Sequence, residues 1–247
     1  MITEKNEFDE IIKCSKDPIY FIENYVKVQH PTRGIIDLEL YDCQKDLIDL
    51  YAFNPKVIAK IPRQSGKTLC AAVVLLWHAM FTPDFIIFIG SPQMCNSDEI
   101  LRRIKFVYEN LPDFLKAPLE SYNKHELDFK NGSRIFARAI SHHSGKATSV
   151  SLLYLDEFAF CASPMAEEFW ISMAPCMVEG RCLISSTPNH ENDPFMRLWD
   201  KVTNDEDSEF ISYEIDWRDI PRCEKFEEQM CEQIGLEHWT REFMCEV

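Results

Sequence analysis

The stretch that decides the fold is Val57-Ile58-Ala59-Lys60-Ile61-Pro62-Arg63-Gln64-Ser65-Gly66-Lys67-Thr68. An apolar run ends at a proline, a polar turn follows, and an apolar helical pattern begins at Leu69. This order of strand, turn and helix, with Gly-Lys-Thr where the helix starts, is typical of a phosphate-binding loop. The N–H groups of the turn and the positive end of the helix dipole would then point at one anion.

The residue types of this loop suit a nucleotide with a bound metal ion. Lys67 can reach the β- and γ-phosphates, and the Thr68 hydroxyl can hold Mg²⁺. The residues expected to contact the nucleotide are Gln64, Ser65, Gly66, Lys67 and Thr68. The general pattern has a glycine at the position of Ile61, so an ordinary strand-turn-helix without a ligand is the alternative.

The composition is that of a soluble globular protein with one sizeable core and room for a small subdomain. Of the 247 residues, 46% are hydrophobic and 27% are charged, and the net charge is −15. Such acidity argues against a stand-alone nucleic-acid binder, because nonspecific binding depends on Lys and Arg. The sequence has no apolar run that could span a membrane and no signal peptide, and its ten cysteines form no CxxC pair. We therefore predict a cytosolic protein with reduced thiols.

A second decisive stretch, Val150-Ser151-Leu152-Leu153-Tyr154-Leu155-Asp156-Glu157, is an apolar run that ends in two carboxylates. Carboxylates are rarely buried without a partner or a task. Next to a phosphate-binding loop, Asp156 would hold Mg²⁺ through water, and Glu157 would polarise the attacking water. The alternative is an exposed strand end that is acidic by chance.

Two further polar features complete the candidate site. The strand that begins at Arg181 ends in Ser185-Ser186-Thr187, whose hydroxyls could bond the γ-phosphate or the lytic water and act as a sensor. Such a cluster is otherwise ordinary turn chemistry. Upstream of the loop, Gln44 offers an amide donor and an acceptor that match the edge of adenine, although a surface glutamine on a helix is the commoner case.

Short buried strands that alternate with helices predict an α/β fold, with a mostly parallel sheet and helices on both faces. We expect three parts: a helical lead-in at 1–40, the core at 41–220, and C-terminal helices of a lid subdomain or linker at 221–247. Alternating residues around Asn131-Gly132 predict a hairpin. The chain beyond residue 194 shows no pattern that indicates chemistry.

Taken together, the motifs resemble the terminase large subunit of tailed bacteriophages. The stretches that carry the resemblance are Tyr41–Gln44, Arg63–Thr68, Leu111–Leu115, Asn131–Ser133, Leu155–Phe160 and Ser185–Asn189. The resemblance implies a RecA-like P-loop ATPase of the additional-strand catalytic-glutamate type, with a small lid subdomain. In that family, hydrolysis of ATP with Mg²⁺ drives double-stranded viral DNA into a procapsid. The family's loop lacks the early glycine in the same way, which accounts for Ile61.

The resemblance also implies roles for single residues. Arg63 matches an arginine that engages the γ-phosphate, and it would be catalytic together with Lys67 and Glu157. Thr68 and Asp156 match the residues that hold Mg²⁺. The remaining matches are the adenine-side Gln44 and the residues that couple hydrolysis to motion, Ser185, Ser186 and Thr187.

Two departures from the family pattern are expected to matter. Lys146 stands in the region where many members offer an arginine to the neighbouring subunit, and a lysine cannot form the same bidentate contact. The family's nuclease domain would follow Val247, so we expect no nuclease activity from these residues.

The implied partners are double-stranded DNA, a portal protein and a small terminase subunit, in the host cytoplasm. The chain would be a monomer in isolation, a ring of copies when assembled, and a weak DNA binder by itself because of its charge. Two other functions stay open. A two-lobed helicase or translocase would need a second lobe, for which 247 residues leave no room. An ATP-binding switch without turnover would have no need of Glu157.

Overall fold

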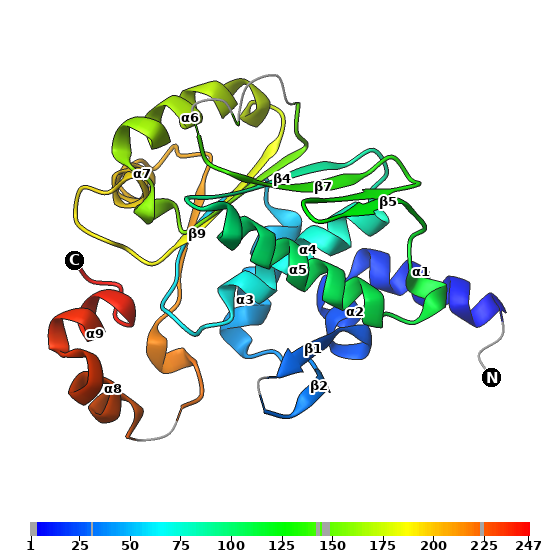
Figure 1. Cartoon of the computed structure of the whole chain (residues 1–247), viewed down its shortest axis with the longest axis horizontal. Helices are drawn as coiled ribbons and strands as arrows, with labels where there is room; N and C mark the ends of the chain where they lie inside the picture. The colour runs from blue at the N-terminus through cyan, green and yellow to red at the C-terminus, as the bar shows by residue number, and fades with distance from the viewer. Residues whose placement is uncertain (1–3, 31, 142–143, 145–148, 223–224) are drawn as a thin grey trace.

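One eight-stranded sheet forms the centre of the molecule, in the order β10-β3-β9-β8-β4-β7-β6-β5, with helices on both of its sides (Figure 1). The computed structural model describes residues 4–30, 32–141, 144, 149–222 and 225–247. The predicted trans-acting Lys146 lies outside these ranges. Neighbouring strands from β10 to β7 pair in parallel, and β6 and β5 pair antiparallel. The predicted α/β fold with a mostly parallel sheet is confirmed.

The parallel strands are the short apolar runs of the sequence. Their bounds are β3 (Lys56–Lys60), β4 (Ile86–Ser91), β7 (Arg134–Ala139), β8 (Leu152–Asp156), β9 (Arg181–Ser186) and β10 (Ile211–Glu214). Strand β9 lies between β3 and β8, and its Ser185 pairs with Ala59 on one side and Asp156 on the other. Because β3, β9 and β8 are parallel neighbours, the loop, the hydroxyl cluster and the acidic pair that follow them lie together at the C-terminal ends of these strands.

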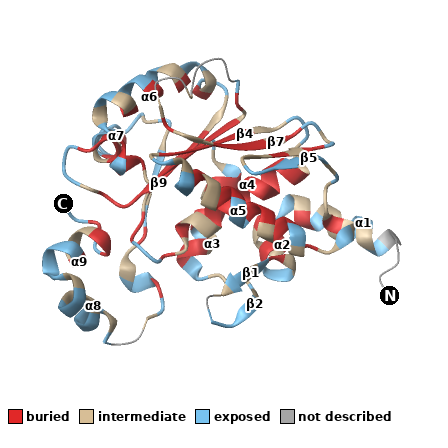
Figure 2. Cartoon of the chain, in the orientation of Figure 1, coloured by how far each residue is buried: buried red, intermediate tan, exposed pale blue. Residues whose placement is uncertain are grey.

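Alternate residues of β3, β4, β7, β8 and β9 enter two different hydrophobic cores, as strands covered on both faces require. The helices of the first core include α3 (Asp42–Phe53), α4 (Lys67–Phe81) and α5 (Met94–Asn110), and those of the second include α6 (Ser163–Met177) and α7 (Pro194–Thr203). On β3, Val57 packs in the first core and Ile58 in the second. The central strands and α4 are largely buried (Figure 2). The start of α4 is thereby held beside the sheet edge.

Two helices and a hairpin precede α3. Helices α1 (Glu4–Lys16) and α2 (Pro18–Tyr25) lie in the region predicted to be a helical lead-in, and Asp17 caps α2 by accepting a backbone hydrogen bond at 2.8 Å. Strands β1 (Lys27–His30) and β2 (Gly34–Asp37) then form an antiparallel pair that the sequence did not predict. Neither strand has a buried residue, so no alternation of buried apolar and exposed polar side chains marks them in the sequence.

The hairpin predicted around Asn131-Gly132 is confirmed, since β6 (Glu126–Phe129) and β7 run antiparallel on either side of it. Gly132 has φ +88°, and a Cβ at this position would come within 2.0 Å of Asp84 Oδ1, so the turn requires glycine. Strand β5 (Leu119–Asn123) extends the sheet beyond β6 and was not predicted.

The C-terminal part consists of η3 (Trp217–Asp219), α8 (Phe226–Ile234) and α9 (Leu236–Glu242). The two α-helices confirm the helices predicted there. They meet at Trp239, which is fully buried and whose ring centroid lies 4.9 Å from that of Trp217 and 4.6 Å from that of Phe243. None of the helices that the structure describes is long and apolar enough to cross a membrane.

Candidate active site

The loop after β3 carries the predicted phosphate-binding residues into the start of α4. Ile61 is fully buried, and its N–H donates to the Ser186 carbonyl at 3.0 Å, so the residue at the usual glycine position belongs to the core. Gly66 has φ +82° and caps α4, and its carbonyl accepts a hydrogen bond from the Cys70 N–H at 3.0 Å. The N-terminus of α4, with Lys67 as its first residue, therefore faces the space where an anion would bind.

Gln44, on α3, supports the loop through a hydrogen bond to its backbone. Its Nε2 donates to the Ser65 carbonyl at 2.7 Å, and its Oε1 accepts a hydrogen bond from the Tyr41 N–H at 3.1 Å. A Cβ at Gly66 would lie 2.5 Å from the same Nε2. The structure brings Gln44 to the loop and uses both ends of its amide there. One N–H of Nε2 is left for a further acceptor, so contact with adenine stays a prediction.

Asp156 ends β8 inside a buried group of hydroxyls. Its Oδ1 accepts hydrogen bonds from Tyr154 Oη and Ser185 Oγ, each at 3.2 Å, and those two oxygens are 2.8 Å apart. Burial raises the pKa of Asp156, while the nearby positive charge of Lys67 acts to lower it. Tyr154 was not among the predicted site residues. Tyr154 and Asp156 are two residues apart on one strand, so their side chains lie on the same face of the sheet. This spacing could have identified Tyr154 from the sequence.

Glu157 turns away from Asp156 through a left-handed backbone, with φ 54° and ψ 40°. Non-glycine residues pay for this conformation, and such strain is found mostly at functional sites. The Glu157 N–H donates to the Ser185 carbonyl at 2.9 Å, which fixes the turn. The Glu157 carboxylate lies 2.7 Å from Lys67 Nζ through Oε1, and Oε2 accepts a long hydrogen bond of 3.5 Å from Thr187 Oγ1.

The three predicted hydroxyls are all buried, and each has a different partner. Ser185 binds the carboxylate of Asp156, and Thr187 binds that of Glu157. Ser186 Oγ accepts from the Ala159 N–H at 3.2 Å and donates to the Thr187 carbonyl at 2.7 Å. The cluster therefore connects Asp156 and Glu157 to the segment that follows β9. A local turn would need no such contacts with another strand.

The C-terminal segment, for which the sequence indicates no chemistry, contacts the loop. Glu242, at the end of α9, forms an ion pair with Arg63, and its carbonyl accepts a hydrogen bond from the Arg63 N–H at 2.9 Å. Arg222 donates to the Arg63 carbonyl and to Gln64 Oε1, each at 3.2 Å. No local pattern could have revealed these contacts, because Arg63 and Glu242 are 179 residues apart in the sequence.

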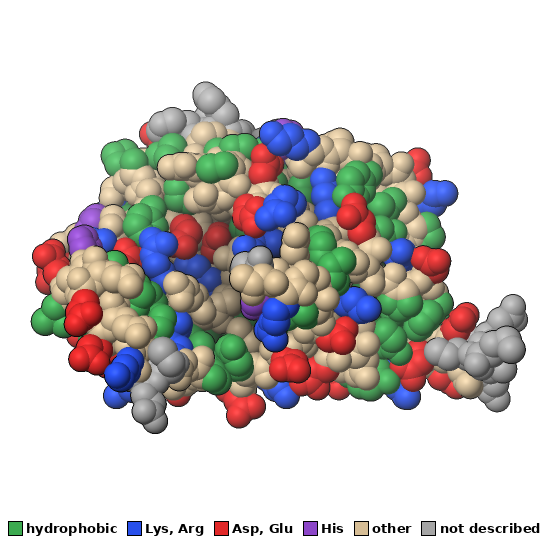
Figure 3. All heavy atoms as spheres, turned by 60° about the horizontal axis from the view of Figure 1, so that its bottom comes forward, with side chains coloured by type: hydrophobic (Ala, Val, Ile, Leu, Met, Phe, Trp, Pro, Cys, Tyr) green, Lys and Arg blue, Asp and Glu red, His purple; other side chains and the backbone are tan. Residues whose placement is uncertain are grey.

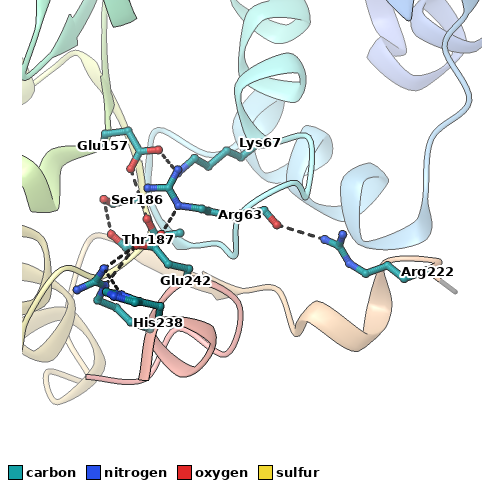
Figure 4. Close-up of polar contacts among 9 residues, drawn as sticks. Arg63, Lys67, Glu157, Ser186, Thr187, Arg222, His238 and Glu242 are labelled. Carbon is teal, nitrogen blue, oxygen red and sulfur yellow. Dashed lines mark hydrogen bonds and ion pairs between the residues drawn. The ribbon is translucent and has the colours of Figure 1, made fainter. Parts of the chain in front are cut away.

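The loop and the strand ends enclose a cavity of about 430 Å³. Its lining residues are Arg63, Thr68, Pro92, Gln93, Asn96, Glu99, Arg103, Asp156, Glu157 and Phe160. Lys67, Glu157 and Thr187 converge beside Arg63, and Glu242 reaches Arg63 from α9 (Figure 4). The surface is hollowed on this side of the molecule, and Lys and Arg side chains gather in the hollow (Figure 3). A second cavity, of about 470 Å³ between α6 and α7, contains none of the predicted site residues.

The residues of the first cavity fit a nucleotide with Mg²⁺. The Ser65 hydroxyl is buried and has no hydrogen-bond partner among the described residues, so it could donate a hydrogen bond to a phosphate oxygen. Thr68 and Asp156 line the cavity together and offer the hard oxygen ligands that Mg²⁺ prefers. The cations Arg63 and Arg103 lie on the same lining, where they would oppose the charge of a phosphate chain.

Residues 58–247 match the family model described as terminase large subunit, T4likevirus-type, N-terminal. This chain belongs to the terminase large subunit family. It is the ATPase domain of a large terminase, the subunit of ATP-driven phage DNA packaging. The predicted family and activity are therefore confirmed.

Solved structures share the fold of this terminase domain. The large terminase ATPase domain of Thermus phage P74-26 is 18% identical, with a TM-score of 0.66 over 84% of this chain and 94% of that chain. The large terminase of bacteriophage HK97 is 18% identical, with a TM-score of 0.72 over 93% of this chain and 54% of that one. A large terminase from a thermophilic bacteriophage in complex with ADP is 10% identical, with a TM-score of 0.67 over 84% and 53%.

A DEAD box protein from Methanococcus jannaschii also shares the RecA-like fold, with 14% identity and a TM-score of 0.51 over 78% of this chain and 56% of that one. The chain spans about half the length of the HK97 terminase and of the ADP-bound terminase. The likeness to the DEAD box protein thus concerns the fold alone, and the family match favours the terminase over the helicase alternative.

Proposed function

We propose that this domain hydrolyses ATP in the cavity between its phosphate-binding loop and the ends of β3, β8 and β9, and that hydrolysis drives double-stranded DNA into a procapsid. The observation that carries the proposal is the 2.7 Å contact between Glu157 and Lys67 beside the cavity that Thr68 and Asp156 line. A carboxylate at that place can act as the general base for an attacking water.

In the proposed reaction, the N–H groups at the start of α4 and the Lys67 ammonium bind the β- and γ-phosphates. Gln44 would contact adenine with its remaining N–H, next to the loop that it braces. Once Lys67 binds phosphate oxygens, its contact with Glu157 weakens. The Glu157 carboxylate, still bonded to Thr187, is then free to accept a proton from water.

Thr68 and Asp156 would hold Mg²⁺, which offsets the negative charge of the phosphates when it is bound. Asp156 would be kept in place by Tyr154 and Ser185. Arg63 would stabilise the charge that develops on the γ-phosphate in the transition state.

Departure of the γ-phosphate would be sensed through the same side chains. Ser185 bonds Asp156, and Thr187 bonds Glu157, so a change at either carboxylate alters the contacts of the segment after β9. We propose that this moves the C-terminal helices at 221–247, as a lid or linker, against the core at 41–220. Within the proposed lead-in at 1–40, Phe21 and Ile22 pack in the first hydrophobic core.

The proposed partners are double-stranded DNA, a portal protein, a small terminase subunit and further copies of the same chain in a ring, in the host cytoplasm. Family membership supports these partners, because packaging requires a motor that holds DNA at a procapsid entrance. Lys146 is proposed as the cation offered to the neighbouring copy.

The test is the rate of phosphate release by the wild-type protein and by Glu157→Gln. We expect the substitution to lower the rate by roughly 10²- to 10⁴-fold, because an amide cannot accept the proton, and to leave ADP affinity within a factor of two or so. Glu179→Gln, at an exposed glutamate outside the cavity, is the matched control and should retain the wild-type rate. Equal and near-zero rates in wild type and Glu157→Gln would favour an ATP-binding switch instead.

A further inference from the structure

We propose that Glu242 of α9 is a positioning residue that orients Arg63 toward the γ-phosphate side of the cavity. This inference rests on the proposed role of Arg63 in ATP hydrolysis. It assigns part of the active site to the last helix of the described chain.

The C-terminal segment holds Arg63 at three points. The Arg63 N–H donates to the Glu242 carbonyl at 2.9 Å, and the Arg63 carbonyl accepts a hydrogen bond from Arg222 Nη2 at 3.2 Å. The third point is the side chain, where Nε of Arg63 binds Oε2 of Glu242. Both backbone groups of Arg63 and the inner end of its guanidinium are thus bound by residues from the C-terminal segment.

The geometry of the guanidinium then determines where its other donors point. The group is planar, with its N–H donors in a rigid fork, so a contact at Nε fixes the direction of Nη1 and Nη2. Within the described residues, neither Nη atom has a hydrogen-bond partner, and Arg63 lines the cavity together with Thr68 and Asp156. The side chain of Arg63 is 51% exposed and that of Glu242 only 11%, so the buried carboxylate is the anchor and the arginine is the group that it directs.

Glu242 is itself firmly held. Its Oε1 accepts hydrogen bonds from Arg241 at 3.0 and 3.3 Å, so the carboxylate lies between two arginines. Directly after it, Phe243 stacks on Trp239, with ring centroids 4.6 Å apart. Arg222 is fixed in the same cluster, with its guanidinium 4.3 Å from the ring centroid of Phe226. The anchor therefore belongs to a packed unit rather than to a free surface side chain.

A cation placed in advance stabilises a transition state without reorganising during the reaction, and small displacements of such a group are costly. Any event that shifts α9 would move Glu242, and with it Arg63. The position of the last helix is thereby coupled to the rate of hydrolysis.

The experiment is a double-mutant cycle on phosphate release with Arg63→Ala, Glu242→Ala and the double variant. We expect Glu242→Ala to lower kcat about 10-fold, with little change in KM, and to add no further loss in the Arg63→Ala background. Glu242→Gln, which keeps an oxygen acceptor for Nε, should lose less than Glu242→Ala. Glu237→Ala, at an exposed glutamate on the same helix, is the matched control and should keep the wild-type rate.

Two binding measurements separate positioning from a general loss of structure. ADP has no γ-phosphate, so its affinity should be unchanged in Glu242→Ala, whereas the affinity for a non-hydrolysable ATP analogue should fall. If Glu242→Ala unfolds, the same cycle is run with Glu242→Gln. Wild-type kcat in the Glu242 variants, or losses that add in the double variant, would overturn the inference while leaving the proposed function in place. Full activity of Arg63→Ala would instead refute the role of Arg63.

Discussion

Glu157 and Asp156 are neighbours in the sequence, yet they serve different parts of the site. Asp156 points into the buried hydroxyls at Tyr154 and Ser185, whereas the left-handed turn at Glu157 directs the second carboxylate to Lys67. The sequence predicts the pair of acids and their general task. The turn that separates them depends on a hydrogen bond to β9, a strand that follows in the chain only after α6.

His78 gives a prediction about pH at the same scale. It is buried in α4 and stacked on Phe85, with ring centroids 5.1 Å apart, and burial lowers its pKa to about 4. In the unfolded chain, His78 takes up a proton at a pH near 6.5, whereas in the folded protein it does so only near pH 4. The contribution of neutral His78 to the unfolding free energy is therefore fully present above about pH 6.5 and declines as the pH falls from about 6.5 to about 4. The loss is about 3 kcal/mol at most.

We expect His78→Phe to flatten this part of the pH profile, as measured by urea unfolding between pH of about 7 and about 4.5. Exposed His190→Gln is the control and should follow the wild-type curve. Carboxylates with strong ion pairs, such as Glu126 with a pKa lowered to about 2, lose their contribution only below about pH 4.5, outside this window. Parallel curves for the wild type and His78→Phe would contradict the prediction.

At the scale of elements, the loop between β3 and α4 depends on one glycine for two reasons. Gly66 has φ +82°, which costs other residues about 1–2 kcal/mol, and an added Cβ would also lie 2.5 Å from Gln44 Nε2. We expect Gly66→Ala to lower ADP affinity at least about 10-fold, because relief of the clash must displace either the loop or its brace.

The matched control is Gly34→Ala in the hairpin of β1 and β2. Gly34 has φ +74°, but a Cβ there meets nothing within 4 Å. Both variants should therefore lose stability through backbone strain, and only Gly66→Ala should lose ADP affinity in calorimetric titration. Wild-type ADP affinity in Gly66→Ala would show that the loop tolerates a side chain and that Gln44 does not brace it.

The elements that could be predicted from the sequence are those marked by a continuous run of apolar residues. Helix α4 and the buried strands β3, β4, β8 and β9 were visible as apolar runs between turn residues. The four-residue strands β1 and β2 and the edge strand β5 were not visible, because pairing partners rather than side-chain pattern stabilise them.

For the whole molecule, the net charge of −15 governs contact with DNA. Asp and Glu side chains are spread over the face shown in Figure 3, and Lys and Arg side chains lie in the hollow and elsewhere on the same face. We expect this domain alone to bind duplex DNA weakly at physiological ionic strength, with a Kd above about 1 µM, because few phosphates can be neutralised. Fluorescence anisotropy with a labelled duplex at several salt concentrations measures this.

Lowering the ionic strength should strengthen any binding, since it depends on a small number of Lys and Arg contacts. Tight binding at physiological ionic strength would mean that a local basic surface outweighs the total charge, and the proposed need for a ring of copies around DNA would then lose its support.

The sequence by itself determined the sheet-and-helix class, the polar loop before α4, the acidic strand end and the hydroxyl cluster. Each is carried by consecutive residues, whose burial and polarity follow directly from their order. Only the tertiary structure decided that β9 lies between β3 and β8, that Gln44 supports Ser65, and that Arg63 is held by Glu242 and Arg222. Those contacts join residues far apart in the chain, and an ion pair between distant residues leaves no local periodicity to detect.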